Sequence, residues 1–218
     1  MTQLTSLAIA EPTVGGLSNT SKMPSASWSI SANRCKTGRK LAKVKGSVCN
    51  GCYALKGRYT FGTVQFALER RLDSWENHRE QWREAMIYLM HHKKSILAKP
   101  HFRWFDSGDI QSAEMLDDIN AVAYACPNVS FWMPSKEYKI AREYMRNNAI
   151  APNLLIRMSA PMIDQPLPGF AHTSVVYSKE NLPEGQGLNC PAPNQGNQCG
   201  DCRACWEGTT RQVNYHAH

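Results

Sequence analysis

The sequence predicts an α/β protein: a partial (βα) barrel of about five or six parallel strands, followed by a cysteine-rich, metal-bound C-terminal tail. Two observations predict this architecture. Short apolar runs alternate with stretches of helical periodicity between residues 101 and 177, which is typical of parallel strands joined by crossover helices. Seven of the eight cysteines fall in two compact groups near the two ends of the chain. We therefore expect an irregular lead-in over residues 1–24, the barrel over 25–180 and the tail over 181–218.

The N-terminal part of the barrel is expected to hold one strand, one long loop and one long helix. Residues 26–32 alternate between apolar and polar side chains, which is typical of a strand. Residues 36–62 lack any periodicity, and a connection of that length is usually functional or disordered. From Val64 to the residues before Pro100, apolar side chains recur at helical spacing, which predicts one long amphipathic helix.

The middle of the chain repeats a rhythm of strand and helix. The predicted strands cover residues 101–105, 128–133, 153–158 and 173–177, and the predicted helices cover residues 112–125 and 136–148. Ser112 is placed to cap the first of these helices at its N-terminus. The carboxyl ends of parallel strands meet at one edge of a sheet, where the functional sites of such folds are found.

The composition indicates a soluble globular protein. The chain has 218 residues, of which 42% are hydrophobic and 20% charged. No apolar run approaches the eighteen residues of a membrane-spanning helix, so we expect no membrane partner. The chain opens without the basic and apolar regions of a secretory signal, so we expect a cytoplasmic protein.

Charge is distributed unevenly along the chain. The net charge is +7, yet residues 13–67 contain nine Lys and Arg and no Asp or Glu. Most of these cations lie in the segment 34–58, around the first cysteine group. Such a segment attracts nucleic acid, a phosphorylated or carboxylate-bearing small molecule, or a host protein; the alternative is a solvated basic loop with no partner.

The cysteine spacing predicts metal binding. A Cys-x-x-Cys step lets two thiolates of one tight turn reach a single metal centre. The remaining cysteine, Cys126, lies in an apolar run and is expected to be an ordinary buried thiol. The first group comprises Cys35, Cys49 and Cys52, and the second comprises Cys190, Cys199, Cys202 and Cys205.

Disulfides are the first alternative to metal binding. A chain of this length buries an adequate core without disulfide staples, and clustered cysteines in a reducing cytoplasm more often bind metal. We therefore favour a metal or iron–sulfur role for both groups.

Polar residues follow each predicted strand, which favours a shared site at the carboxyl edge. They are Asp106, Ser107 and Asp109 after the second strand, Ser135 and Lys136 after the third, Arg157 and Ser159 at the end of the fourth, and Ser178 and Lys179 after the fifth.

Several of these motifs resemble known families. A strand that leads into three cysteines ending in Cys49-x-x-Cys52-Tyr, with Ser107-Gly108-Asp109 after the second strand, resembles the radical S-adenosylmethionine superfamily. More narrowly, Lys56-Gly-Arg-Tyr59 and Cys199-Gly-x-Cys-Arg-Ala-Cys-Trp206, together with these motifs, resemble the phage gene product 88 proteins over residues 20–207. A phage-encoded protein would act in the host cytoplasm.

The superfamily resemblance implies a cofactor site. It implies that Cys35, Cys49 and Cys52 hold a 4Fe-4S cluster with one iron open for S-adenosylmethionine. It also implies that Ser107, Gly108 and Asp109 hold the amine of that cofactor, and that Arg157 or Ser159 approaches its carboxylate or ribose. The sequence departs from the superfamily pattern in the gap of thirteen residues between Cys35 and Cys49, where three residues are usual, and in Gly51, where an aromatic residue is common.

The spacing of the second cysteine group does not decide between an iron–sulfur cluster and zinc. Its successive two-residue gaps resemble the ligand run of ferredoxins more than a zinc ribbon, so we expect a second iron–sulfur cluster, with zinc as the alternative. A single cluster that draws on both groups is a further alternative. The leading expectation for function is thus a phage iron–sulfur protein that acts as a radical S-adenosylmethionine enzyme. The alternative is a non-enzymatic iron–sulfur or zinc protein that binds nucleic acid or a host protein.

Overall fold

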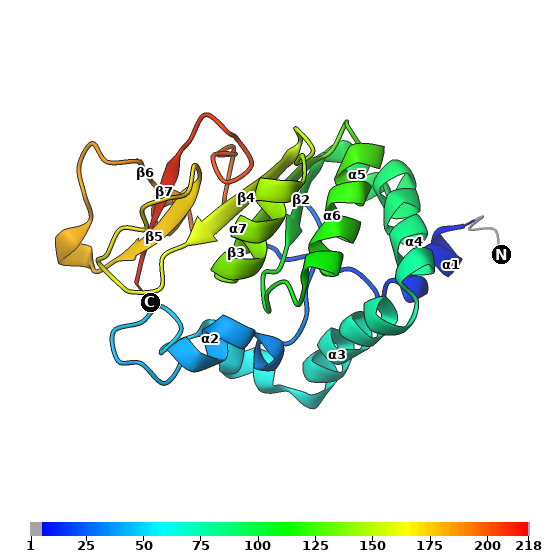
Figure 1. Ribbon diagram of the computed structural model, residues 1–218, viewed down its shortest axis with the longest axis horizontal. Coiled ribbons are helices and arrows are strands. Elements are labelled where there is room, and N and C mark those ends of the chain that lie inside the picture. The colour runs from blue at the N-terminus through cyan, green and yellow to red at the C-terminus, as the bar shows by residue number, and fades with distance from the viewer. Residues whose placement is uncertain (1–5, 218) are drawn as a thin grey trace.

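The computed structural model describes residues 6–217 and shows a mixed α/β architecture around one parallel sheet (Figure 1). The sheet has seven strands in the order β1-β2-β3-β4-β5-β7-β6, and it is open, with β1 at one edge and β6 at the other. The strands are β1 (Ser27–Trp28), β2 (His101–Trp104), β3 (Ser130–Ser135), β4 (Leu154–Ser159), β5 (Thr173–Tyr177), β6 (Leu188–Asn189) and β7 (Gln212–His216). The structure confirms the predicted parallel sheet. The partial barrel stays a prediction.

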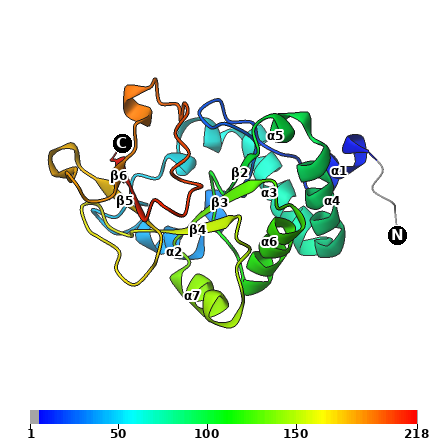
Figure 2. The ribbon, with the colours of Figure 1, turned by 90° about the horizontal axis from the view of Figure 1, so that it is seen from above.

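Helices and the C-terminal segment cover opposite sides of the sheet. The helices are α1 (Leu7–Thr13), α2 (Lys36–Leu41), α3 (Gly62–Asn77), α4 (Arg79–His92), α5 (Lys94–Ala98), α6 (Ala113–Ala125) and α7 (Tyr138–Asn147). Figure 2 shows α6 and α7 on one side of β2, β3 and β4 and the C-terminal segment on the other. Within residues 6–217, no helix combines the length and the apolar character that a membrane crossing requires.

The main core lies between the sheet and α1, α3, α4, α6 and α7. Alternate strand residues such as Phe102, Phe131 and Met133 point into it and are fully buried. Trp28 stands at its centre, with its ring 5.2 Å from that of Trp82 in an edge-on arrangement. The other face of the sheet carries the intervening residues, and there Trp206 of the tail packs against Trp132, with ring centroids 5.1 Å apart.

The lead-in predicted to be irregular contains helix α1, although residues 1–5 of that prediction lie outside the described part of the chain. The helix forms because it is anchored by distant residues. Ala10 and Val14 are fully buried against the core, and the indole N–H of Trp28 donates a 2.8 Å hydrogen bond to the carbonyl of Val14. A sequence without strong local periodicity thus becomes helical through tertiary contacts.

The prediction of one continuous helix from Val64 to the residues before Pro100 is wrong. The segment is helical, but it is divided into α3, α4 and α5. His78 leaves the helical region, with φ −144° and ψ 49°. The bend brings side chains from both sides of the break to one buried carboxylate. The indole of Trp75 donates to Asp118 at 2.8 Å, and Arg79 Nε donates to the same oxygen at 2.9 Å.

The segment 36–62, predicted to lack regular structure, forms α2 and two 3-10 turns, Tyr53–Leu55 and Gly57–Thr60. These elements are too short for a hydrophobic period, which explains why no pattern is visible in the sequence. Hydrogen bonds to the loop after β4 hold the segment in place: Val48 N donates to the carbonyl of Pro161 at 2.9 Å, and Ile163 N donates to the carbonyl of Gly46 at 3.0 Å.

The tail also departs from the prediction, because it supplies strands β6 and β7 to the sheet. β7 pairs with β5 over five residues, from Thr173 opposite Gln212 to Tyr177 opposite His216. Val213 and Asn214 are buried by this pairing. The sheet therefore contains more strands than the predicted five or six, and the tail is held by strand pairing in addition to any metal.

Candidate functional site

The first cysteine group lies at the carboxyl edge of the sheet, as predicted. Cys35 precedes α2, and Cys49 and Cys52 belong to one turn in which Cys52 N donates to the carbonyl of Cys49 at 3.2 Å. The sulfurs of Cys35 and Cys49 lie 3.6 and 3.7 Å from the position that a Cβ on Gly38 would take. Because Gly38 has no side chain, the two sulfurs face a common space that any larger residue would occupy.

The thiols of this group are partly buried. Burial raises the pKa of Cys35, and the negative charges of Asp109, Cys52 and Cys49 raise it further. Burial also raises the pKa of Cys49, which the charge of Lys136 opposes. The metal-free thiols of Cys35 and Cys49 are therefore protonated near neutral pH, and a metal that binds their thiolates must release these protons.

The turn Ser107-Gly108-Asp109 fastens the end of β2 to its neighbours. Ser107 Oγ donates to the carbonyl of Ile30 at 2.6 Å. Gly108 has φ +82°, and a Cβ there would lie 2.3 Å from Ile30 Cγ1 and 2.7 Å from the Ile30 carbonyl oxygen. No other residue fits this position without movement of the backbone.

Asp109 forms hydrogen bonds with the end of β3 and with the loop that follows it. Its carboxylate accepts hydrogen bonds from Ser135 Oγ at 2.7 Å and from the backbone N–H groups of Ile110 and Lys136, both at 2.8 Å. Burial raises the pKa of Asp109 to about 6, although the hydrogen bonds from Lys136 and Ser135 act in the opposite direction. A carboxylate has about four acceptor positions, so Asp109 has capacity for one more donor.

Glu137 links β3 to the cysteine segment. Its carboxylate accepts two hydrogen bonds from Thr37, one from the backbone N–H and one from the hydroxyl, both at 2.8 Å. Thr37 lies two residues after Cys35, so this contact fixes α2 against the end of β3. In the sequence, only the position of Glu137 directly after Ser135 and Lys136 at the end of a strand indicates a role for it.

Two tyrosines meet Asp106, and the sequence analysis assigned neither of them a role. Tyr59 donates to the Asp106 carboxylate at 2.9 Å, and Tyr53 donates to its backbone carbonyl. Ser27 and Ser29 of the first strand segment donate to the same carboxylate. These contacts close the loop that follows Cys52 over the end of β2.

The second cysteine group lies in the tail, against the opposite face of the sheet from the helices. Cys202 N donates to the Cys199 carbonyl at 3.0 Å, and Cys205 Sγ lies 3.1 Å from the hydroxyl of Tyr215. Burial raises the pKa of Cys205 to about 11, whereas the Tyr215 hydroxyl and the charge of Arg157 lower it. Burial and the charges of Cys190 and Cys202 likewise raise the pKa of Cys199.

The side chain of Arg157 contacts the tail that carries the second cysteine group and makes no hydrogen bond to the Ser107–Asp109 turn. It is fully buried, and its terminal N–H groups donate to four backbone carbonyls. The acceptors are Thr173 at 3.0 Å, Arg211 at 3.1 Å, Ala204 at 3.0 Å and Thr210 at 2.9 Å. Ser159, by contrast, lies at the carboxyl end of β4, where its hydroxyl accepts from Ser174 Oγ at 3.0 Å and its carbonyl from Tyr138 at 2.6 Å.

Several buried donors on the tail side of the sheet lack an acceptor within residues 6–217. They include the Nε atoms of Arg103 and Arg157 and the indole nitrogen of Trp132. Arg103 lies over the ring of Trp132 at 4.4 Å, in the adjacent strand. Buried donors are normally paired, so these atoms are able to donate to water or to a bound group.

The cysteine side chains do not form a compact site for one ion. In the described part of the chain, no three or more His, Cys, Asp and Glu side chains are placed to hold a single metal ion. The donor set is nevertheless that of a thiolate centre, with three cysteines at the strand edge and four in the tail.

Comparison with known proteins identifies a family. A family model described as Gene product 88 matches residues 3–208. No curated protein and no solved structure matches the chain. The description of the family states no activity, so a function has to be argued from the residues themselves.

Proposed function

Because the chain belongs to the phage gene product 88 family, whose description states no activity, we propose its function from the two cysteine groups. We propose an iron–sulfur protein in which Cys35, Cys49 and Cys52 bind a 4Fe-4S cluster, leaving one iron open for S-adenosylmethionine. The observation that carries this proposal is the common space of the Cys35 and Cys49 sulfurs beside Gly38, at the carboxyl edge of a parallel sheet.

The number of ligands supports an open site. Three thiolates are one fewer than the irons of a 4Fe-4S cluster, so one iron is free to bind an external ligand. The side chains have to close around the cluster when it binds, because they are not arranged for a single ion in its absence.

The surrounding residues would orient and shield the ligand. Glu137 holds the Cys35 segment against the end of β3 through Thr37, and Asp109 ties the turn after β2 to Ser135 and Lys136. The last acceptor position of Asp109 is available to an amine. When bound, the cluster would supply one electron from an external reductant to cleave a sulfonium C–S bond, which leaves a carbon radical able to abstract hydrogen from a substrate. Tyr53 and Tyr59 close one side of the site over Asp106.

The four-cysteine group would hold a second cluster. Cys190, Cys199, Cys202 and Cys205 supply all four ligands, so this centre has no open position. The sulfides of an iron–sulfur cluster accept N–H donors, which suits the unpaired Nε atoms of Arg103 and Arg157, and the two cations balance a negative cluster. Zinc, or one cluster that draws on both groups, would use the same cysteines.

Metal analysis with single variants tests this proposal. Protein isolated without oxygen is expected to be brown, to absorb broadly at roughly 400 nm, and to contain iron and acid-labile sulfide. Cys202→Ser is expected to lose iron, whereas Cys126→Ser, at a buried thiol outside both groups, retains it. A colourless protein with stoichiometric zinc and no sulfide would contradict the proposal.

A second measurement separates the enzyme from the alternative. S-adenosylmethionine at saturating concentration is expected to change the paramagnetic resonance spectrum of the reduced protein, because it would bind the open iron. Asp109→Ala is expected to weaken that effect by removing a hydrogen-bond acceptor, on the order of 1.5–3 kcal/mol for a charged donor. An unchanged wild-type spectrum would favour the non-enzymatic protein.

A further inference from the structure

We propose that the surface formed by α2, the segment 42–66 and α7 binds single-stranded nucleic acid. We call it the cationic face. Its cations are Arg34, Lys36, Arg39, Lys40, Lys43, Lys45, Lys56 and Arg58, with Lys139, Arg142 and Arg146 of α7. Its exposed aromatic residues are Tyr53, Phe61 and Phe66. None of these residues is a cysteine, so the proposal goes beyond the metal chemistry and does not require a metal at either cysteine group.

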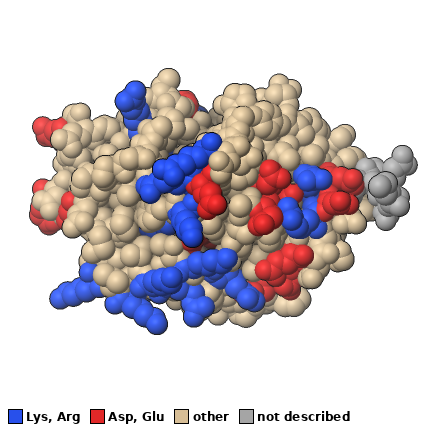
Figure 3. All heavy atoms as spheres, in the orientation of Figure 1, with Lys and Arg blue, Asp and Glu red and all other residues tan. Residues whose placement is uncertain are grey.

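The charges of the cationic face are open to an external anion. The eight cations between Arg34 and Arg58 are all exposed. Within residues 6–217, the structure pairs only one of them with an acid, Arg34 with Glu69 at 2.7 Å. Figure 3 shows these side chains as a band over α2 and the loop after it, along the lower edge of the view. A single-sign surface of this kind attracts a polyanion.

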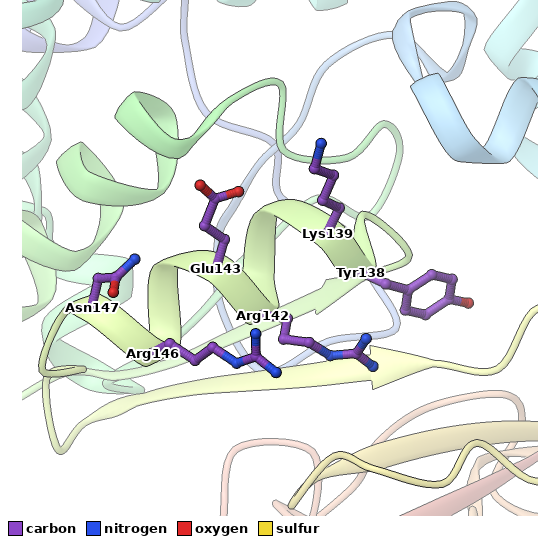
Figure 4. A pocket seen from close by; sticks show the side chains of 6 residues that line it. All are labelled: Tyr138, Lys139, Arg142, Glu143, Arg146 and Asn147. Atoms are coloured by element: carbon purple, nitrogen blue, oxygen red, sulfur yellow. The ribbon is translucent and has the colours of Figure 1, made fainter.

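Helix α7 extends the face on the far side of the first cysteine group. The start of α7 meets α2 through the contact between Glu137 and Thr37. A shallow pocket follows α7, lined by Tyr138, Lys139, Arg142, Glu143, Arg146 and Asn147. Figure 4 shows Arg142 and Arg146 extending from one side of the helix and Lys139 and Glu143 from the other. A chain of phosphates along α2 and α7 would therefore pass Cys35, which lies directly before α2.

The exposed aromatic rings favour a single strand. Phe66 is 68% exposed, Phe61 59% and Tyr53 50%, and they lie among the cations. The hydroxyl of Tyr53 is tied to Asp106, so its ring is held in place at the surface. Exposed rings between cations stack on unpaired bases, whereas a duplex hides the faces of its bases. The combination indicates a single strand and not double-stranded DNA.

Charge neutralisation at two sites provides a matched test. Fluorescence anisotropy would follow the binding of a labelled single-stranded oligonucleotide of mixed sequence, as DNA and as RNA, at several salt concentrations. Lys43→Gln/Lys45→Gln removes two charges from the cationic face, and Lys94→Gln/Lys99→Gln removes two exposed charges in and after α5, at the other end of the molecule.

The two double variants are expected to differ. The first should weaken binding on the order of 10-fold near 0.1 M salt and reduce the salt slope by about 1.4, since each phosphate contact contributes about 0.7. The second should bind as the wild type does. Equal losses in both variants would mean that net charge alone attracts the strand and would overturn the proposal.

Removal of the rings tests the choice of a single strand. Phe66→Ala, on the exposed side of α3, is expected to weaken binding of the single strand about 5-fold or more. Tyr124→Ala, at a ring that is 50% exposed on α6, should leave it unchanged. A duplex of the same sequence should bind more weakly than the single strand. Equal or tighter binding of the duplex, or binding to vesicles with anionic lipid but to no oligonucleotide, would overturn the proposal.

Discussion

The guanidinium of Arg157 and the backbone carbonyl of Ala204 lie 3.0 Å apart across 47 residues of sequence. This contact is one of four that the fully buried Arg157 makes with backbone carbonyls; three of them join β4 to the cysteine tail, and the fourth reaches Thr173 of β5. Burial lowers the pKa of Arg157, yet an arginine stays charged, so the four carbonyls serve to stabilise its charge.

Arg157→Met should therefore destabilise the fold. The substitution removes a donor from four backbone carbonyls, of which that of Arg211 keeps the N–H of Thr173 as a partner. We therefore expect the free energy of unfolding to fall by about 3 kcal/mol. Urea unfolding would measure it. Arg146→Met, at an exposed arginine of α7, should change the same quantity by less than about 0.5 kcal/mol. Normal stability in Arg157→Met, with weakened cofactor binding, would return this residue to the role implied by the superfamily resemblance.

Gly108→Ala should destabilise the strand edge more than a positive φ alone explains. Its Cβ would overlap the side chain and the carbonyl of Ile30, whereas Gly169, with φ +83°, has nothing within 4 Å of the same atom. We expect Gly169→Ala to cost about 1–2 kcal/mol and Gly108→Ala clearly more, measured by urea unfolding. Equal losses would show that the contact with Ile30 relaxes without cost.

Gly38→Ala tests the space between two sulfurs. An alanine inside a helix usually stabilises it by about 0.5–1 kcal/mol relative to glycine. The new methyl group would lie 3.1 Å from Cys35 Cβ, and this close contact opposes the gain, so we expect little change in stability. The new methyl group would nevertheless occupy the space that the Cys35 and Cys49 sulfurs face, and iron bound at the first group should decrease. Gly62→Ala, at an open position, is the control. Full iron content in Gly38→Ala would argue against a cluster at this place.

Acid sensitivity should depend on His172. Burial lowers its pKa below the ordinary value of 6.5, and the charges of Arg157 and Arg211 act in the same direction. The unfolded chain then binds more protons than the folded protein as the pH falls through about 6.5, so the folded state loses stability there. Urea unfolding at pH 8, 7, 6 and 5 should show a smaller loss in His172→Gln than in the wild type. A parallel loss in both proteins would exclude His172 as a cause.

Much of the fold follows from local sequence patterns. The strand–helix alternation after residue 101 predicts a parallel sheet, and the structure confirms β2, β3, β4 and β5 close to the predicted positions. Ser112 caps α6, with its hydroxyl accepting from Met115 N at 3.3 Å. Cys126 is buried, as its apolar neighbours predict. These features depend on residues a few positions apart, so the periodicity and the caps of the chain determine them.

Other features depend on residues far apart in the chain, which only the tertiary structure brings together. β7 becomes a strand because it pairs with β5, and α1 becomes a helix because it packs against α4 and Trp28. The spacing of the cysteines predicts two groups, but the structure decides that Arg157 faces the tail and that Glu137 anchors the segment after Cys35. Local propensity carries no information about such partners, since their energies arise only when the folded chain removes them from water.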